Sequence, residues 1–99
     1  MLYAITGTDA PNSLPGRLAA RAAHLARVTQ LRDQGRLVLA GPHPRLDTSE
    51  PGEAGYSGSL IIAEFVNLAD AEAWAAADPY VMAGVWAEVT VKPFVQVMP

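Results

Sequence analysis

The sequence predicts an α+β domain in which two helices cover one face of a four-stranded antiparallel sheet. The apolar segments read, in order, as strand, helix, strand, strand, helix and strand. The length of 99 residues suits one domain that covers residues 1–99. Segments 37–40 and 60–63 are apolar at every position, so both faces of the sheet are apolar. We therefore expect a ferredoxin-like βαββαβ fold whose second face packs, sheet to sheet, on another copy in a symmetric homodimer.

The composition excludes several classes of protein. Hydrophobic residues make up 51% of the chain and charged residues 17%, which excludes a disordered protein. Because the chain has no cysteine, a disulfide scaffold, a thiolate zinc site and a cysteine nucleophile are excluded. No apolar run reaches the roughly 18–20 residues of a membrane span, and residues 1–5 do not resemble a signal peptide. We expect a cytoplasmic protein that does not contact membranes.

The charged residues are distributed unevenly. The net charge of −3 argues against nucleic acid as a partner. Residues 1–45 hold six arginines against two acids, whereas residues 46–99 hold one lysine against eight acids. One interpretation is that the two halves attract each other within the fold. The other is a positive pocket beside the first helix, suited to an anionic ligand.

The first half of the chain predicts a strand, a helix and a second strand. Residues 2–8 form the strand, and Ser13 or Asn12 caps a helix over residues 17–34. Gly35 ends that helix. Residues 36–40 form the second strand, which Gly41 and Pro42 end. Residues 42–58 are rich in proline and glycine, and predict a long functional or flexible loop, part of which could be a longer hairpin arm.

The second half predicts a strand over residues 59–65, then a helix and a last strand. Asn67 caps the helix, with Asp70 completing the cap, and Asp78 and Pro79 end it and begin a short turn. Residues 85–92 alternate, which places Val85, Ala87, Val89 and Val91 on one face of the last strand and Trp86 on the other. Residues 94–98 form an apolar tail, either an edge strand or a segment that crosses to a partner.

Two ionisable residues interrupt the apolar face of the first helix. On a helical wheel, the apolar arc comprises Leu18, Ala22, Leu25, Val28 and Leu31. Arg21 and His24 fall within the flank of this arc. Ionisable groups on an apolar wall tend to mark functional sites. The structural alternative is that Arg21 extends to the surface and His24 is a hydrogen-bonded boundary residue.

His24 is the candidate acid–base group, because an imidazole exchanges protons near neutral pH. A catalytic histidine usually has a carboxylate on its other nitrogen. Asp78 is the first candidate for this partner and Asp9 the second, although Asp78 could simply cap a turn and Asp9 could form an Asx turn. Arg21 would stabilise an oxyanion, and the hydroxyl of Ser59 could bind substrate.

No cofactor or metal site is predicted. His24, His43, Asp9 and Asp78 lack the spacing typical of metal ligands. The glycines near residues 35–42 lack the spacing of a phosphate-binding loop. We therefore expect a site that works without either group.

Short motifs that occur in order along nearly the whole chain resemble the YciI-like family. These motifs are Arg17-Leu18, Arg21-Ala22-Ala23-His24-Leu25, Gly35-Arg36-Leu37, Ala40-Gly41-Pro42, Gly58-Ser59, Asp78-Pro79-Tyr80, Ala83-Gly84-Val85 and Lys92-Pro93-Phe94. The resemblance implies a dimeric α+β barrel of ferredoxin-like protomers, with a His–Asp pair in each pocket. That pair corresponds to His24 and Asp78, with Arg21 and Ser59 beside it and Asp9 close by.

Two function classes follow. Most members of the family have no settled reaction, and one branch is similar to enzymes that remove chloride from chlorinated hydroxyquinols. The first class is therefore a cofactor-free lyase, isomerase or dehalogenase that acts on a small phenolic, enolic or carbonyl substrate. The second is a non-catalytic dimer that binds a small ligand or a protein partner.

Overall fold

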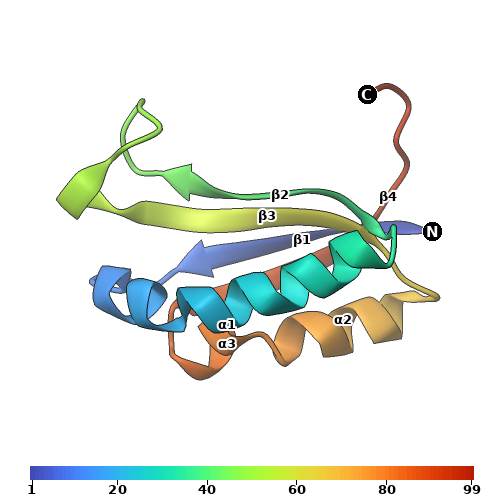
Figure 1. Cartoon of the computed structure of the whole chain (residues 1–99), viewed down its shortest axis with the longest axis horizontal. Coiled ribbons are helices and arrows are strands. Elements are labelled where there is room, and N and C mark those ends of the chain that lie inside the picture. Colours follow the sequence, from blue (N-terminus) through green and yellow to red (C-terminus); the bar gives the residue numbers. More distant parts are fainter.

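The computed structural model describes residues 1–99 as a four-stranded sheet with its helices on one face (Figure 1). The elements are β1 (Leu2–Asp9), α1 (Leu14–Asp33), β2 (Leu37–Pro44), the 3-10 turn η1 (Gly52–Ala54), β3 (Tyr56–Glu64), α2 (Leu68–Ala76), α3 (Pro79–Met82) and β4 (Trp86–Phe94). The strand order is β2-β3-β1-β4, and every pair is antiparallel. The predicted α+β, ferredoxin-like fold is confirmed. The short turn predicted after Asp78 is the third helix, α3.

Particular residues mark the ends of the two longer helices, α1 and α2. α1 starts at Leu14, earlier than expected, and its first turn contains a proline. Ser13 occupies the cap position, but the predicted side-chain cap is wrong, because its hydroxyl makes no cap hydrogen bond. Gly35 follows it with φ of 70°, a left-handed conformation that favours glycine. The side chain of Asn67 accepts a hydrogen bond from the Asp70 backbone N–H at 2.8 Å, as expected for the cap of α2. No helix in the chain is both long and apolar enough to cross a bilayer.

The predicted loop over residues 42–58 is mostly a hairpin. β2 continues to Pro44 and β3 begins at Tyr56, which leaves only residues 45–55 as the connection. β2 is an edge strand, so a proline such as Pro42 can be accommodated without losing a sheet hydrogen bond on its open side. The long-loop prediction was therefore wrong at both ends, and the hairpin arm is correct.

The regular alternation predicted for the last strand was also wrong. Thr8 pairs with Glu88, but Asp9 pairs with Trp86, so Ala87 is an extra residue in a β-bulge. The extra residue reverses the parity of the strand, and Trp86 joins Val89 on the helix-covered face. The indole lies over Gly7, where any side chain would collide with the ring.

The buried face of α1 is rotated from the predicted apolar arc. Leu18 is 62% exposed and Leu25 39% exposed. The buried residues of the helix are instead Arg17, His24, Val28 and Leu31. Two polar side chains can occupy this face because each has a buried carboxylate partner.

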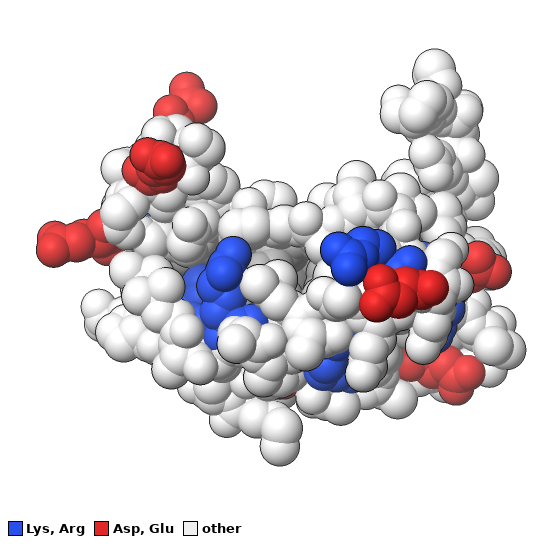
Figure 2. Space-filling view, viewed as in Figure 1, with Lys and Arg blue, Asp and Glu red and all other residues white.

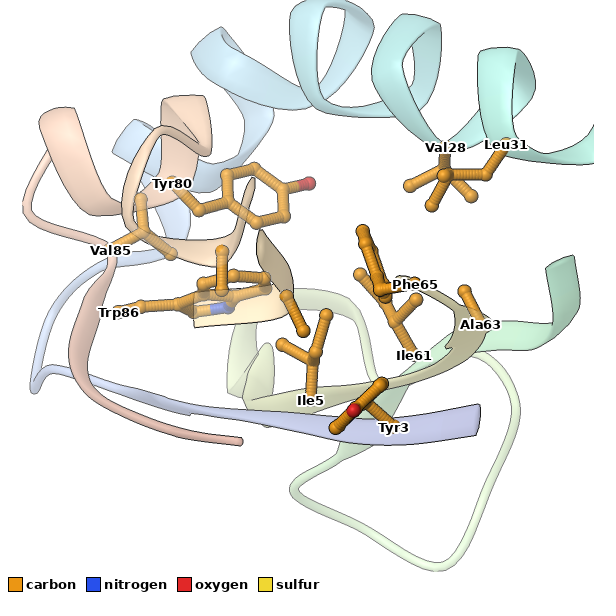
Figure 3. Packing of buried hydrophobic residues seen from close by; sticks show 12 residues of the cluster. Tyr3, Ile5, Val28, Leu31, Ile61, Ala63, Phe65, Tyr80, Val85 and Trp86 are labelled. Carbon is orange, nitrogen blue, oxygen red and sulfur yellow. The ribbon is translucent and has the colours of Figure 1, made fainter. Parts of the chain in front are cut away.

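The hydrophobic core lies between the helices and the inner face of the sheet (Figure 3). Figure 3 shows Val28 and Leu31 of α1 opposite Phe65 and residues of β1 and β3, with Tyr80, Val85 and Trp86 closing one end.

Two segments extend from the sheet on the side away from the helices (Figure 1). They are the connection over residues 45–55 and the tail over residues 95–99, which forms no strand. Of the predicted tail over residues 94–98, Phe94 belongs to β4, and the edge-strand alternative is wrong for residues 95–98. Both segments expose apolar side chains: Leu46 is 56% exposed, Val97 82% and Met98 78%.

Candidate functional site

A cavity of about 260 Å³ lies on the helix-covered side of the sheet, between α1 and the strands β2 and β3. Arg17, Arg21 and His24 line it from α1, together with Ser59 of β3 and Tyr80 of α3. Figure 2 shows basic side chains at several places on this face of the molecule, with acidic ones on the projecting β2–β3 connection and also among the basic ones at the other end of the face. The basic side chains that line the cavity are Arg17 and Arg21 of α1.

His24 and Asp78 are in direct contact at the wall of this cavity. The Nδ1 atom of His24 lies 2.9 Å from both carboxylate oxygens of Asp78. The side chain of His24 is 8% exposed and that of Asp78 is fully buried. An ionised carboxylate only accepts hydrogen bonds, so Nδ1 carries the hydrogen and Nε2 carries the lone pair of the neutral ring.

Asp78 is held in place by the start of α3. It is the N-cap residue, and its Oδ1 accepts a hydrogen bond from the Tyr80 backbone N–H at 2.9 Å. Arg27 Nη1 approaches Oδ2 at 3.4 Å. The sequence left open whether Asp78 caps a turn or supports His24. The structure shows that one carboxylate does both.

The faces of the His24 ring are also fixed. Its ring stacks on Tyr80 with centroids 4.1 Å apart and planes 15° from parallel. Trp86 contacts it edge-on at 5.6 Å between centroids. The imidazole is therefore held by one hydrogen-bonded carboxylate and two aromatic rings.

Asp9 does not contact His24 but binds Arg17. Two nitrogens of the guanidinium donate to the Asp9 carboxylate at 2.8 Å each. Nη2 of Arg17 also donates to Ser59 Oγ at 2.9 Å and to the Gly58 carbonyl at 3.3 Å. Of the predicted site residues, Asp9 and Ser59 thus form one buried cluster, and His24 and Asp78 form another.

Arg21 is exposed, lines the cavity and forms no ion pair within the chain. Arg17, which we did not predict as a site residue, lines the same cavity. The spacing of Arg17, Arg21 and His24 at i, i+4 and i+7 places all three on one helix face, and this is the signal that could have identified it.

Tyr80 is the second residue that the sequence reasoning missed. Burial raises the pKa of Tyr80, while the guanidinium groups of Arg17 and Arg21 oppose the shift. The phenol therefore keeps its proton at physiological pH. For metal binding, no group of three or more histidine or acidic side chains is suitably arranged.

Comparisons with known proteins match nearly the whole chain. The model of the YCII-related domain family matches residues 1–95. The Protein YciI of Escherichia coli is 56% identical over 97 residues, covering 98% of this chain and 99% of that protein. An uncharacterized protein of Haemophilus influenzae is 55% identical over the same length and coverage.

One solved structure with a similar fold is that of a protein named as an enzyme. It is the 5-chloro-2-hydroxyhydroquinone dehydrochlorinase TftG of Burkholderia phenoliruptrix, in complex with 2,5-dihydroxybenzoquinone. The TM-score is 0.83 at 28% identity, and the match covers 96% of this chain and 94% of TftG. By the family match over nearly its whole length and by its close sequence relatives, this chain belongs to the YCII-related domain family.

Proposed function

We propose that this protein is a small acid–base enzyme that needs no cofactor and acts on a phenolic, enolic or carbonyl substrate. One observation carries the proposal. The Asp78 carboxylate occupies Nδ1 of His24, while His24 lines a cavity of about 260 Å³. The free Nε2 is then the atom that takes a proton from the substrate or returns it.

Asp78 has two roles in this proposal. It fixes the tautomer of His24, and its negative charge stabilises the imidazolium that forms when Nε2 accepts a proton. A positioned acid–base group of this kind contributes roughly 10²–10⁴-fold to a rate.

Arg21 and Ser59 would bind the substrate. Arg21 has no acid partner in the chain, so its charge is available to an oxyanion in the cavity. The Ser59 hydroxyl accepts a hydrogen bond from Arg17 and retains its own hydrogen for donation. Asp9 acts only indirectly, because it holds Arg17 beside Ser59.

The similarity to TftG supports the substrate class. TftG is named for a dehydrochlorination and was solved with a dihydroxybenzoquinone. Removing HCl from a chlorinated hydroxyquinol releases one proton and one chloride ion. That reaction needs proton transfer and no external oxidant, which is chemistry that a His–Asp pair can perform.

We also propose that the protein acts as a cytoplasmic homodimer packed through the uncovered sheet face. Leu39, on an outer strand of the sheet, is 45% exposed, and the two projecting segments expose further apolar residues on the same side. A second copy of the chain would cover this surface.

Replacing His24 tests the catalytic proposal. We expect His24→Gln to slow two reactions by at least about 100-fold. One is chloride release from 5-chloro-2-hydroxyhydroquinone. The other is exchange of the ring protons of 2,5-dihydroxybenzoquinone with D₂O, followed by proton NMR. This exchange requires only proton transfer at carbon.

The matched control is His43→Gln, which changes the other histidine of the chain, exposed on β2. The control should react like the parent protein. Turnover in His24→Gln equal to that of the parent would contradict the proposal. Binding of both compounds without turnover by the parent would instead favour the alternative, a non-catalytic ligand-binding dimer.

A further inference from the structure

Tyr80 presents its hydroxyl to the same cavity as His24. Its side chain extends from α3 into the space beneath α1, with the hydroxyl directed away from Val85 and Trp86 (Figure 3). The residue is 2% exposed, yet it lines the cavity. Its phenol is therefore accessible from the cavity and shielded elsewhere.

The position of this ring is closely determined. Its backbone N–H donates to Asp78 Oδ1, the same carboxylate that holds His24. One face stacks on the imidazole, and Trp86 packs against the ring at 5.5 Å between centroids. The Arg17 guanidinium carbon lies 4.8 Å from the ring centroid. Asp78 thus positions both His24 and Tyr80, whose rings stack on each other and each carry a hydrogen that can be donated.

The hydroxyl has no acceptor for its hydrogen within the chain. Asp78, the nearest carboxylate by sequence, is bound to the backbone N–H of Tyr80 and to His24. The nearby cation, Arg17, has only donors and cannot accept the hydrogen. Because the hydroxyl faces the cavity, it is free to donate to an oxygen atom that enters the cavity.

We propose that Tyr80 is a further catalytic residue, whose hydroxyl donates a hydrogen bond to the substrate oxygen on which negative charge develops. This inference rests on the proposed function, in which His24 moves the proton. No proton leaves Tyr80, and its hydrogen bond strengthens as the carbonyl oxygen becomes an enolate or phenolate. The substrate is thereby specified as a planar molecule with an oxygen acceptor conjugated to the carbon or hydroxyl that exchanges its proton.

The test is Tyr80→Phe, which removes the hydroxyl and keeps both the stacked ring and the backbone bond to Asp78. Loss of one preorganised donor to an oxyanion typically costs roughly 10²–10³-fold in kcat. We therefore expect kcat for the D₂O exchange of 2,5-dihydroxybenzoquinone to fall about 100-fold, with KM changing much less. The matched control is Tyr3→Phe, because Tyr3 is a core tyrosine outside the cavity.

Three outcomes are decisive. If Tyr80→Phe reacts like the parent while His24→Gln is inactive, the proposed function stands and the role of Tyr80 is overturned. If the parent itself catalyses no exchange, both fail. If Tyr80→Phe loses kcat and keeps its thermal stability, the role of Tyr80 is supported.

A second variant keeps the inference testable if Tyr80→Phe does not fold. Incorporation of 3,5-difluorotyrosine at position 80 makes the hydroxyl more acidic with little change in shape. We expect the basic limb of the pH–kcat profile to move to lower pH. An unmoved profile with unchanged kcat would overturn the inference, because a tyrosine that only packs would give that result.

Discussion

The chain buries two aspartates beside one cavity, and their partners differ. Asp9 faces Arg17, a permanent cation, through two bonds of 2.8 Å. Asp78 faces the imidazole of His24, which is not a permanent cation, at 2.9 Å. Both carboxylates are almost fully buried, with 1% and 0% of their side chains exposed.

This difference distinguishes a pair that can only support the structure from a pair that can exchange a proton. An arginine–carboxylate pair keeps the same charge state over the pH range of a cell, so it can hold β1, α1 and β3 together but cannot exchange a proton. A histidine–carboxylate pair can exchange one. We therefore propose a structural role for the pair of Asp9 and Arg17, and proton transfer for the pair of His24 and Asp78.

Replacing Asp78 should have the largest effect, and the effect should be on activity. We expect Asp78→Asn to reduce turnover by roughly 10²–10⁴-fold, because the amide neither stabilises the imidazolium nor fixes the tautomer. Asparagine remains a good helix cap, and Arg27, the cation that loses a carboxylate partner, is partly exposed to solvent. The free energy of unfolding should therefore fall by only about 1–3 kcal/mol. Steady-state kinetics and urea titration check the two expectations, and unchanged turnover would refute the assignment.

Replacing Asp9 should lower stability more than activity. Asp9→Asn leaves the buried guanidinium of Arg17 without its counter-charge, which typically costs about 3–5 kcal/mol of unfolding free energy. Urea denaturation measures this loss. The control is Asp33→Asn, which removes an exposed partner of Arg32 and should cost less than about 1 kcal/mol. Equal losses in both variants would mean that the Asp9 pair is not a structural clamp.

The smallest effect should appear only in alkali. Burial raises the pKa of Tyr80 above its ordinary value of 10.0, so the folded chain holds this proton at a pH where the unfolded chain has lost it. Stability should therefore be unaffected by this group below pH 10 and should fall as the pH rises above it. Urea titrations at about pH 9 and pH 11 should show a smaller fall for Tyr80→Phe than for the parent. If the free energy of unfolding fell equally in both proteins, the fall would not come from the Tyr80 phenol.

The sequence predicted much of this arrangement for physical reasons. The order of elements follows from hydrophobic periodicity, and the family motifs point to the same fold. Asp78 before Pro79 has the pattern of a helix cap, and His24 interrupts an apolar face. Both signals are local along the chain. The contact between His24 and Asp78 could therefore be proposed before their distance was known.

The remaining features depend on tertiary contacts. The helical wheel placed Leu18 inside and overlooked Arg17. The helical spacing puts Arg17 on the same face as Arg21 and His24, but its burial depends on Asp9, which lies on β1. The β-bulge at Ala87 is also invisible to an alternating pattern, since it depends on how Trp86 packs over Gly7. Tyr80 was overlooked because its stacking partner, His24, lies on another helix.

The most direct test of the central claim compares His24→Gln with Asp9→Asn in one assay. The measurement is the rate at which 2,5-dihydroxybenzoquinone exchanges its ring protons in D₂O, at a temperature where circular dichroism shows both variants folded. We expect a loss of at least about 100-fold for His24→Gln and a change of less than about tenfold for Asp9→Asn. Normal exchange in His24→Gln, with exchange lost in folded Asp9→Asn, would contradict it.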